Sequence, residues 1–129
     1  MTATKRYDEQ VMADRTDLPS TLAECEQRRR QLAEQIATIG FTWPGTLQRR
    51  RLTCGRPQCA CHRDPNARHG PYAYWTTKQK QKTVARKLSP QEADIIEEWI
   101  ENRRQIEALL KQINLISQRA LELILQEDP

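Results

Sequence analysis

The residues of this sequence that could do chemistry are concentrated in one short stretch near its middle. Three of the four cysteines, Cys54, Cys59 and Cys61, fall within eight residues and follow the spacing C-x4-C-x-C. The two histidines of the chain, His62 and His69, lie in the same stretch. Zinc is bound by thiolates and imidazoles, and Gly and Pro between the ligands let the backbone wrap around the ion. The stretch therefore predicts a zinc site.

The fourth zinc ligand is expected to be one of the two histidines. His62 directly follows Cys61 and would need a tight reversal of the backbone to reach the same ion. Seven residues separate Cys61 from His69, which closes a loop of workable size, so His69 is preferred and His62 is the alternative. A disulfide is disfavoured, because Cys59 and Cys61 are too close to pair easily and three cysteines leave one unpaired.

The predicted zinc site is structural rather than catalytic. Three thiolates and one imidazole occupy all four positions of the ion and leave none for a substrate or a reactive water. A zinc deaminase would also need a Glu near a ligand histidine, whereas Asp64 is the only acid within residues 46–88. A Cys–His nucleophile is the weaker alternative. We therefore expect a protein that is not an enzyme, with Cys25 in a helical core.

The basic residues are concentrated around the predicted zinc site. Residues 46–88 hold eleven of the 21 Lys and Arg residues but only one of the 17 acids. Such asymmetry indicates a polyanion partner, here DNA with RNA as the alternative. The competing interpretation is a solvated basic face that has no partner. The residues expected to contact nucleic acid are Arg49, Arg50, Arg51, Arg56, Lys78, Lys80, Lys82, Arg86 and Lys87.

The zinc-binding stretch must be positioned by the elements around it. Residues 1–17 are polar and aperiodic and are interpreted as a flexible tail, and apolar residues then recur at 3-4 spacing over 18–39, which predicts a coiled-coil helix. Residues 41–88 form the predicted zinc-binding basic β module, in which two β-rich runs make a hairpin with a basic tip. Tyr72, Tyr74 and Trp75 alternate along its first strand. They either divide between a base-stacking face and a core, or all belong to the core.

A long helix is predicted over residues 89–127. Ser89 can cap it, Pro90 suits the first helical position and Glu92 completes a capping box. Its 3-4 spacing continues for four heptads, and at 1.5 Å per residue the helix is roughly 55 Å long, so we expect it to support a homo-oligomer. The alternative is an intramolecular antiparallel pair with the first helix. The expected fold class is mainly α with a small β element, in which two long coiled-coil-like helices flank a zinc-stapled β-hairpin.

The order of these motifs resembles a largely uncharacterised family of small prokaryotic proteins. That family carries the signature C-G-x-P-x-C-x-C…H-G-P-Y-x-Y, followed by a basic strand and a long helix, and the resemblance covers roughly residues 45–110. It implies that Cys54, Cys59, Cys61 and His69 are the metal positions. It also implies association with mobile genetic elements.

The sequence thus favours a small DNA-binding accessory or regulatory protein with structural Zn²⁺, which assists a recombinase- or transposase-type machine. The competing hypothesis is an adaptor, whose long helices bind a larger protein while the basic face serves solubility. No apolar run approaches the roughly 20 residues that span a bilayer, and the first residues lack a secretory signal. A cytoplasmic location without membrane contact is expected.

Overall fold

The structure, a computed structural model, describes residues 18–127, so the predicted tail of residues 1–17 lies outside the described residues. The chain divides into two compact units. The helical unit contains residues 18–39 and 105–127, and the sheet unit contains residues 40–104. The long helix α3 (Pro90–Glu127) contributes residues to both units.

Helix α2 (Leu22–Thr38) opens the helical unit. It begins four residues later than the 3-4 spacing predicts, because Thr21 is its N-cap and holds an extended backbone. The Glu24 backbone N–H donates to Thr21 Oγ1 at 3.2 Å, and the Ser20 N–H donates to Glu24 Oε2 at 3.0 Å. The bond to Thr21 Oγ1 satisfies a donor that the first turn leaves unpaired, so the helix begins directly after Thr21.

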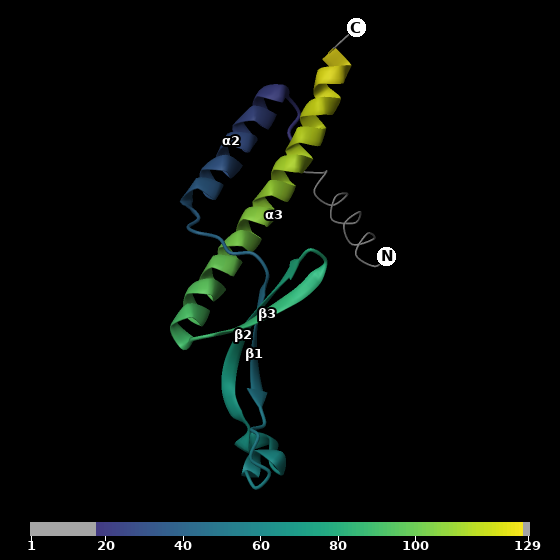
Figure 1. The fold of residues 1–129 in the computed structure, drawn as a ribbon. Coiled ribbons are helices and arrows are strands. Elements are labelled where there is room, and N and C mark those ends of the chain that lie inside the picture. Colours follow the sequence, from purple (N-terminus) through teal and green to yellow (C-terminus); the bar gives the residue numbers. More distant parts are fainter. Residues whose placement is uncertain (1–17, 128–129) are drawn as a thin grey trace. The chain divides into compact units, whose positions relative to one another are not determined.

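The core of the helical unit lies between α2 and the C-terminal part of α3, which run in opposite directions (Figure 1). Cys25 and Leu32 of α2 are buried against Ile116 and Leu123 of α3, and Cys25 is only 2% exposed. The prediction that Cys25 belongs to a core is therefore confirmed. The apolar side chains of α2 are thus buried against α3 of the same chain, as the alternative of an intramolecular antiparallel pair predicts.

The sheet unit contains three antiparallel strands in the order β1-β2-β3. They are β1 (Thr46–Leu52), β2 (His69–Gln79) and β3 (Lys82–Leu88), with β2 in the centre. The predicted fold class is wrong on this point, because it had a lone hairpin flanked by coiled-coil helices. Leu47 and Leu52 are the only apolar residues of β1, too few to reveal from the sequence that this strand pairs with β2.

One face of the sheet packs on the first turns of α3. Ala73 and Leu88 are buried against Ala93, Ile96 and Ile100, and three partly buried side chains complete this core: Trp43, Leu47 and Trp75. Trp75 Nε1 donates to the Pro44 carbonyl oxygen at 2.7 Å, so the indole buries its ring and still satisfies its N–H. This packing gives the sheet a helix-side face and leaves the opposite face to polar and aromatic residues.

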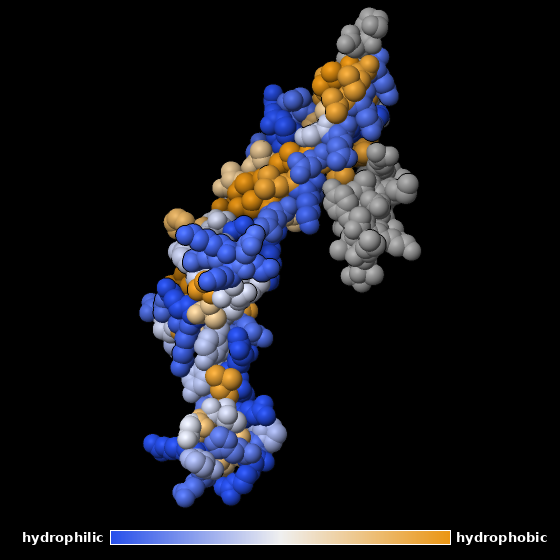
Figure 2. Space-filling model, turned by 45° about the vertical axis from the view of Figure 1, so that its right-hand side comes forward, coloured by the Kyte–Doolittle hydropathy of each residue, from blue (hydrophilic) through white to orange (hydrophobic). Residues whose placement is uncertain are grey.

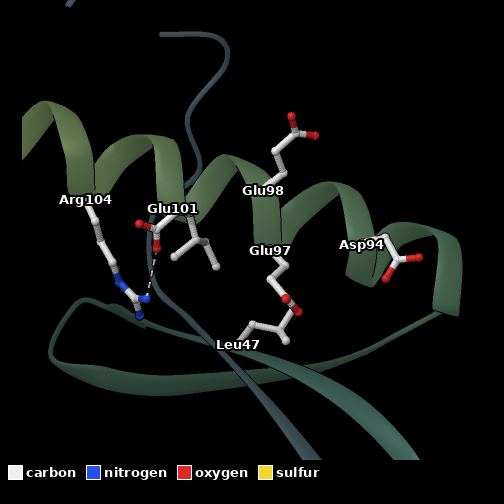
Figure 3. Close-up of a pocket in the computed structure, with 7 residues that line it drawn as sticks. Leu47, Asp94, Glu97, Glu98, Glu101 and Arg104 are labelled. Carbon is white, nitrogen blue, oxygen red and sulfur yellow. Dashed lines mark ion pairs between the residues drawn. The ribbon is translucent and has the colours of Figure 1, made fainter.

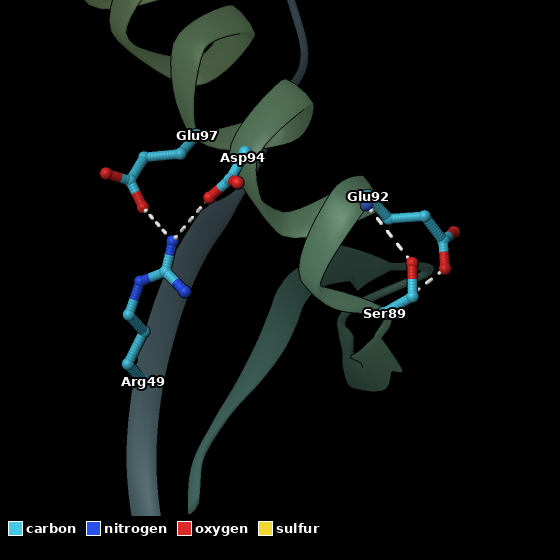
Figure 4. A network of polar contacts seen from close by, with 5 residues as sticks. All are labelled: Arg49, Ser89, Glu92, Asp94 and Glu97. Carbon is cyan, nitrogen blue, oxygen red and sulfur yellow. Dashed lines mark hydrogen bonds and ion pairs between the residues drawn. The ribbon is translucent and has the colours of Figure 1, made fainter.

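The ends of the sheet are closed by local backbone chemistry. Lys80 and Gln81 join β2 to β3 with φ of 49° and 67°, which defines a two-residue turn at the tip of the predicted hairpin. At the other end of the hairpin, the Ser89 N–H donates to Glu92 Oε1 and the Glu92 N–H donates to Ser89 Oγ, both at 3.1 Å (Figure 4). The predicted capping box of α3 is confirmed.

Candidate metal centre and basic sheet

The cysteine cluster is assembled where β1 ends and β2 begins. Cys54 follows β1, Cys59 and Cys61 lie at the short 3-10 helix η2 (Ala60–His62), and His69 is the first residue of β2. The ligand atoms of these four residues all lie within 4.8 Å of one another. They are close enough to hold a metal ion, and His62 is not one of the four.

The spacing of the ligand atoms fits a tetrahedral ion. Cys54 Sγ and Cys61 Sγ are 3.7 Å apart, and Cys59 Sγ is 3.4 Å from His69 Nε2. Sulfur and nitrogen ligands at about 2.3 and 2.1 Å from one ion, at tetrahedral angles, are separated by about 3.6–3.8 Å. These two pairs of atoms therefore stand close to the positions that such an ion requires.

The backbone of the loop prepares two of the thiols differently. The Cys61 backbone N–H, with His69 as the next contribution, lowers the pKa of Cys59 to about 6. The Cys54 N–H, which donates to Cys61 Sγ at 3.3 Å, lowers the pKa of Cys61. Burial and the neighbouring thiols outweigh this effect, so the pKa of Cys61 is raised overall. Backbone N–H groups that point at sulfur favour the thiolate, the form that binds metals.

Two further residues hold the loop in shape. Asp64, the only acid of the segment, accepts a hydrogen bond from the Asn66 N–H at 3.0 Å and caps the second 3-10 helix, η3 (Pro65–Ala67). Gly70 has φ of 114°, and a Cβ there would lie 2.9 Å from the Arg50 carbonyl oxygen. Glycine therefore lets the chain pass close to β1 directly after His69. Asp64 thus stabilises the turn that leads into η3.

The strand register places the basic candidates on different faces. Arg49 pairs with Ala73 and Arg86 with Trp75, which puts both arginines on the helix-side face. Arg50 pairs with Tyr72, and Lys87 pairs with Tyr74, on the opposite face. We call this opposite face the open face and define it by five residues: Gln48, Arg50, Tyr72, Tyr74 and Lys87.

The two arginines of the helix-side face are paired with acids of α3. Arg49 donates to Glu97 Oε2 at 2.7 Å and to Asp94 Oδ1 at 3.4 Å (Figure 4), and Arg86 lies 2.9 Å from Glu92 Oε2. The contact with Glu97 raises the pKa of Arg49 above its already high value. The positive charges of Arg49 and Arg86 are therefore partly neutralised by acids of the protein itself. The sequence offers no signal for these partners, which lie more than 40 residues away in the case of Arg49.

The remaining basic candidates are spread over the loop and the hairpin. Arg51 lies where the pairing of β1 with β2 becomes irregular, and Arg56 lies in the cysteine loop, where its carbonyl accepts the Cys59 N–H at 3.2 Å. Lys82 pairs with Gln79 at the end of the hairpin, Lys78 lies one residue before Gln79 on β2, and Lys80 sits in the turn. The structure thus brings the four predicted metal ligands together, but it does not gather the nine basic candidates into one patch.

A pocket of about 480 Å³ lies beside the helix-side face (Figure 3). Its charged lining is mostly acidic, and Arg104 in it pairs with Glu101 at 3.6 Å. The lining residues are Leu47, Asp94, Glu97, Glu98, Ile100, Glu101 and Arg104. A phosphate would be repelled there, so the acids of α3 make the two sides of the sheet unit electrostatically unequal.

The fold and the site define a small α+β protein with a three-stranded antiparallel sheet and a Cys₃His cluster. The chain belongs to the family described as a domain of unknown function, DUF6788, whose model matches residues 22–101. No curated protein and no solved structure matches the chain. Within the described residues, neither α2 nor α3 has a stretch that is long and apolar enough to cross a membrane.

Proposed function

We propose that this chain is a small zinc-containing protein that binds DNA through its basic sheet unit. The observation that carries the proposal is the division of charge in that unit. Acids of α3 pair with the arginines of the helix-side face, whereas Arg50 and Lys87 of the open face have no ion-pair partner among the described residues. Phosphates are attracted where the cations are least neutralised.

Zinc is the ion that best suits the cluster. Thiolate and imidazole ligands favour zinc, and a full Cys₃His set makes the site structural. The ion would link the loop that follows β1 to the first residue of β2, and it would supply the rigidity that a thin three-stranded sheet lacks. Its role in binding is to hold the strands and their cations in a fixed array.

The proposal is tested by measuring DNA affinity of metal-loaded protein across a salt series, with a mixed-sequence duplex and its separated strand. If about four or five cations meet phosphates of the duplex, log affinity falls against log salt with a slope near −4. A triple Lys78/Lys80/Lys82→Ala variant should flatten that slope by about two or three units.

The matched control for the lysine variant removes three cations from the helical unit. Arg28, Arg29 and Arg30 are consecutive residues of α2, so their replacement by Ala changes the net charge equally. The control should keep the parental slope to within about one unit. Failure of the parent to bind either DNA form in low salt would overturn the proposal.

A protein-binding role is the second candidate, and one observation favours it. The C-terminal part of α3 exposes large apolar side chains, seen as orange atoms toward the C-terminus in Figure 2. Leu121, Ile124 and Leu125 are 56%, 48% and 63% exposed. Such side chains suit a second copy of the chain or a larger protein. Assistance to a recombinase rests on the family resemblance alone. If the protein binds no DNA at any salt concentration of the series, this adaptor role is favoured.

A further inference from the structure

The open face of the sheet carries two aromatic rings on its central strand. Tyr72 and Tyr74 are two residues apart on β2, so both project from the same side of the sheet, and both are only partly buried. Trp75 lies between the sheet and α3 and hydrogen-bonds to Pro44. The three neighbouring aromatics are therefore divided, with one in the core and two on the open face.

A cation from each edge strand lies over these rings. Arg50 of β1 places its guanidinium carbon 4.9 Å from the centre of the Tyr74 ring, and Lys87 of β3 places Nζ 4.2 Å from the centre of the Tyr72 ring. Each contact is diagonal across the sheet, because the direct pairs are Arg50 with Tyr72 and Lys87 with Tyr74. The result is a block in which aromatic surface and positive charge alternate across three strands.

This block matches the two parts of a nucleotide. Bases of any sequence stack on aromatic rings and on guanidinium planes, and the adjacent phosphates pair with cations. A contact between an exposed cation and a ring is weak enough to be exchanged. A base that stacks on the ring displaces the cation toward the phosphate of the same nucleotide. Lys78 continues the positive charge along the same face of β2 toward the turn.

The spacing of the rings favours a single strand over a duplex. Side chains two residues apart on a strand are separated by about 7 Å, whereas stacked bases of a duplex are about 3.4 Å apart. Two successive bases can therefore rest on the two rings only if they are unstacked from each other. Bases inside a duplex are also paired and present their edges, not their flat faces, to a protein.

We infer that the open face is a stacking platform for single-stranded DNA, with Tyr72 and Tyr74 contacting bases and Arg50 and Lys87 contacting the adjoining phosphates. The inference rests on the proposed DNA-binding function and specifies its ligand. It assigns the base contacts to Tyr72 and Tyr74, whereas the lysines of the hairpin contact only phosphates.

The decisive experiment uses the unmodified, metal-loaded protein and three probes. They are an oligothymidine of about 12 nucleotides, the same backbone with abasic sites throughout, and a duplex of equal length. The abasic strand keeps the phosphates and lacks the bases. If each stacked base contributes a factor of about 5 to 150, the abasic strand should bind at least about 20-fold more weakly than oligothymidine. Equal affinity for the two strands would overturn the platform.

The second arm changes the rings. A Tyr72→Leu/Tyr74→Leu variant should bind oligothymidine at least about 20-fold more weakly and bind the duplex within about twofold of the parent. The Tyr72→Phe/Tyr74→Phe variant keeps the rings and should restore binding of the single strand. Phe41→Leu is the matched control, because Phe41 is an exposed ring of the same unit that packs on Trp99. It should leave all affinities unchanged.

The outcomes separate the two proposals. If no probe binds in a salt-dependent way, the DNA-binding function itself fails. If the probes bind but bases make no difference, only the platform fails, and the abasic comparison decides this even where the leucine variant does not fold. An oligouridine that binds far more tightly than oligothymidine would overturn the assignment to DNA.

Discussion

Arg49 and Glu97 form a 2.7 Å hydrogen-bonded ion pair that ties the first strand of the sheet to α3. Asp94, one turn earlier on the same helix, accepts from the same guanidinium nitrogen at 3.4 Å. The next residue, Arg50, projects from the other face and lies over the Tyr74 ring. Adjacent arginines in one basic run thus have different surroundings.

The two arginines should differ in DNA binding. Arg50→Gln removes a cation of the open face and should reduce the slope of log affinity against log salt by about one unit. Arg49→Gln removes a cation already paired with Glu97, so its affinity should stay within about twofold of the parent. Titration of a labelled oligonucleotide at several salt concentrations measures both. A larger loss for Arg49→Gln would contradict the assignment of the two faces.

The metal cluster should contain about one zinc ion per chain, as measured by elemental analysis of protein purified without chelator. Cys54→Ser or His69→Ala removes one of four ligands and should lower the content to near zero after dialysis. His62→Ala and Cys25→Ala are the matched controls, because neither residue belongs to the cluster. Loss of metal from His62→Ala with retention in His69→Ala would show that the other histidine is the ligand.

The capping box of α3 should give stability a dependence on pH. The Ser89 backbone N–H, then the Ser89 hydroxyl and Arg86, lower the pKa of Glu92 below its ordinary value of 4.5. Because the folded-state pKa is the lower one, the carboxylate stabilises the fold above about pH 4.5, and this contribution is lost as the pH falls through the folded value.

Thermal unfolding of the parent and of Glu92→Gln between about pH 3 and 6 tests this dependence. The difference in stability between the parent and Glu92→Gln should be largest at the upper end of this pH range and should shrink as the pH falls. Taking the difference removes the effect of metal release, which both proteins share. Ser89→Ala, which removes the cap itself, should cost about 1 kcal/mol at neutral pH. A difference that grows toward low pH would contradict the prediction.

The core of the helical unit should be sensitive to truncation. Ile116 is 6% exposed and packs with Cys25 and Leu32, so Ile116→Ala should reduce the free energy of unfolding by about 2–5 kcal/mol. Leu125→Ala on the same helix is the control, because Leu125 is 63% exposed and should matter by less than about 0.5 kcal/mol. Chemical denaturation followed by circular dichroism measures both. Equal effects would mean that the two helices do not pack as described.

Local chemistry made several features predictable. Ser89, Pro90 and Glu92 predict a helix start because a capping box satisfies its own donors within four residues. The cysteines and His69 predict a metal cluster because short loops keep their ligand atoms together wherever the rest of the chain lies. Both features depend on residues close in sequence, and the sequence alone therefore determined them.

Tertiary structure decided what the repeated patterns meant. The 3-4 spacing of α2 suits a coiled coil between molecules and a helix pair within one chain equally well, and the burial of Cys25 against α3 selected the latter. Arg29 of the same helix pairs with Glu26 at 2.9 Å on the surface. Likewise, alternation along β2 separates Trp75 from Tyr72 and Tyr74, but only α3 determines which face is buried.

The basic segment shows the same limit. A count of charges predicts a polyanion partner without showing which cations remain available to it. Arg49 forms an ion pair with Glu97, 48 residues later in the chain, whereas Arg50 does not. Successive side chains of a strand point to opposite faces of the sheet, so only Arg49 faces α3. The sequence determined the amount of positive charge and the residues of the Cys₃His cluster. Only the packing of α3 on one face of the sheet decided where that charge is exposed, because a helix buries whichever face it covers.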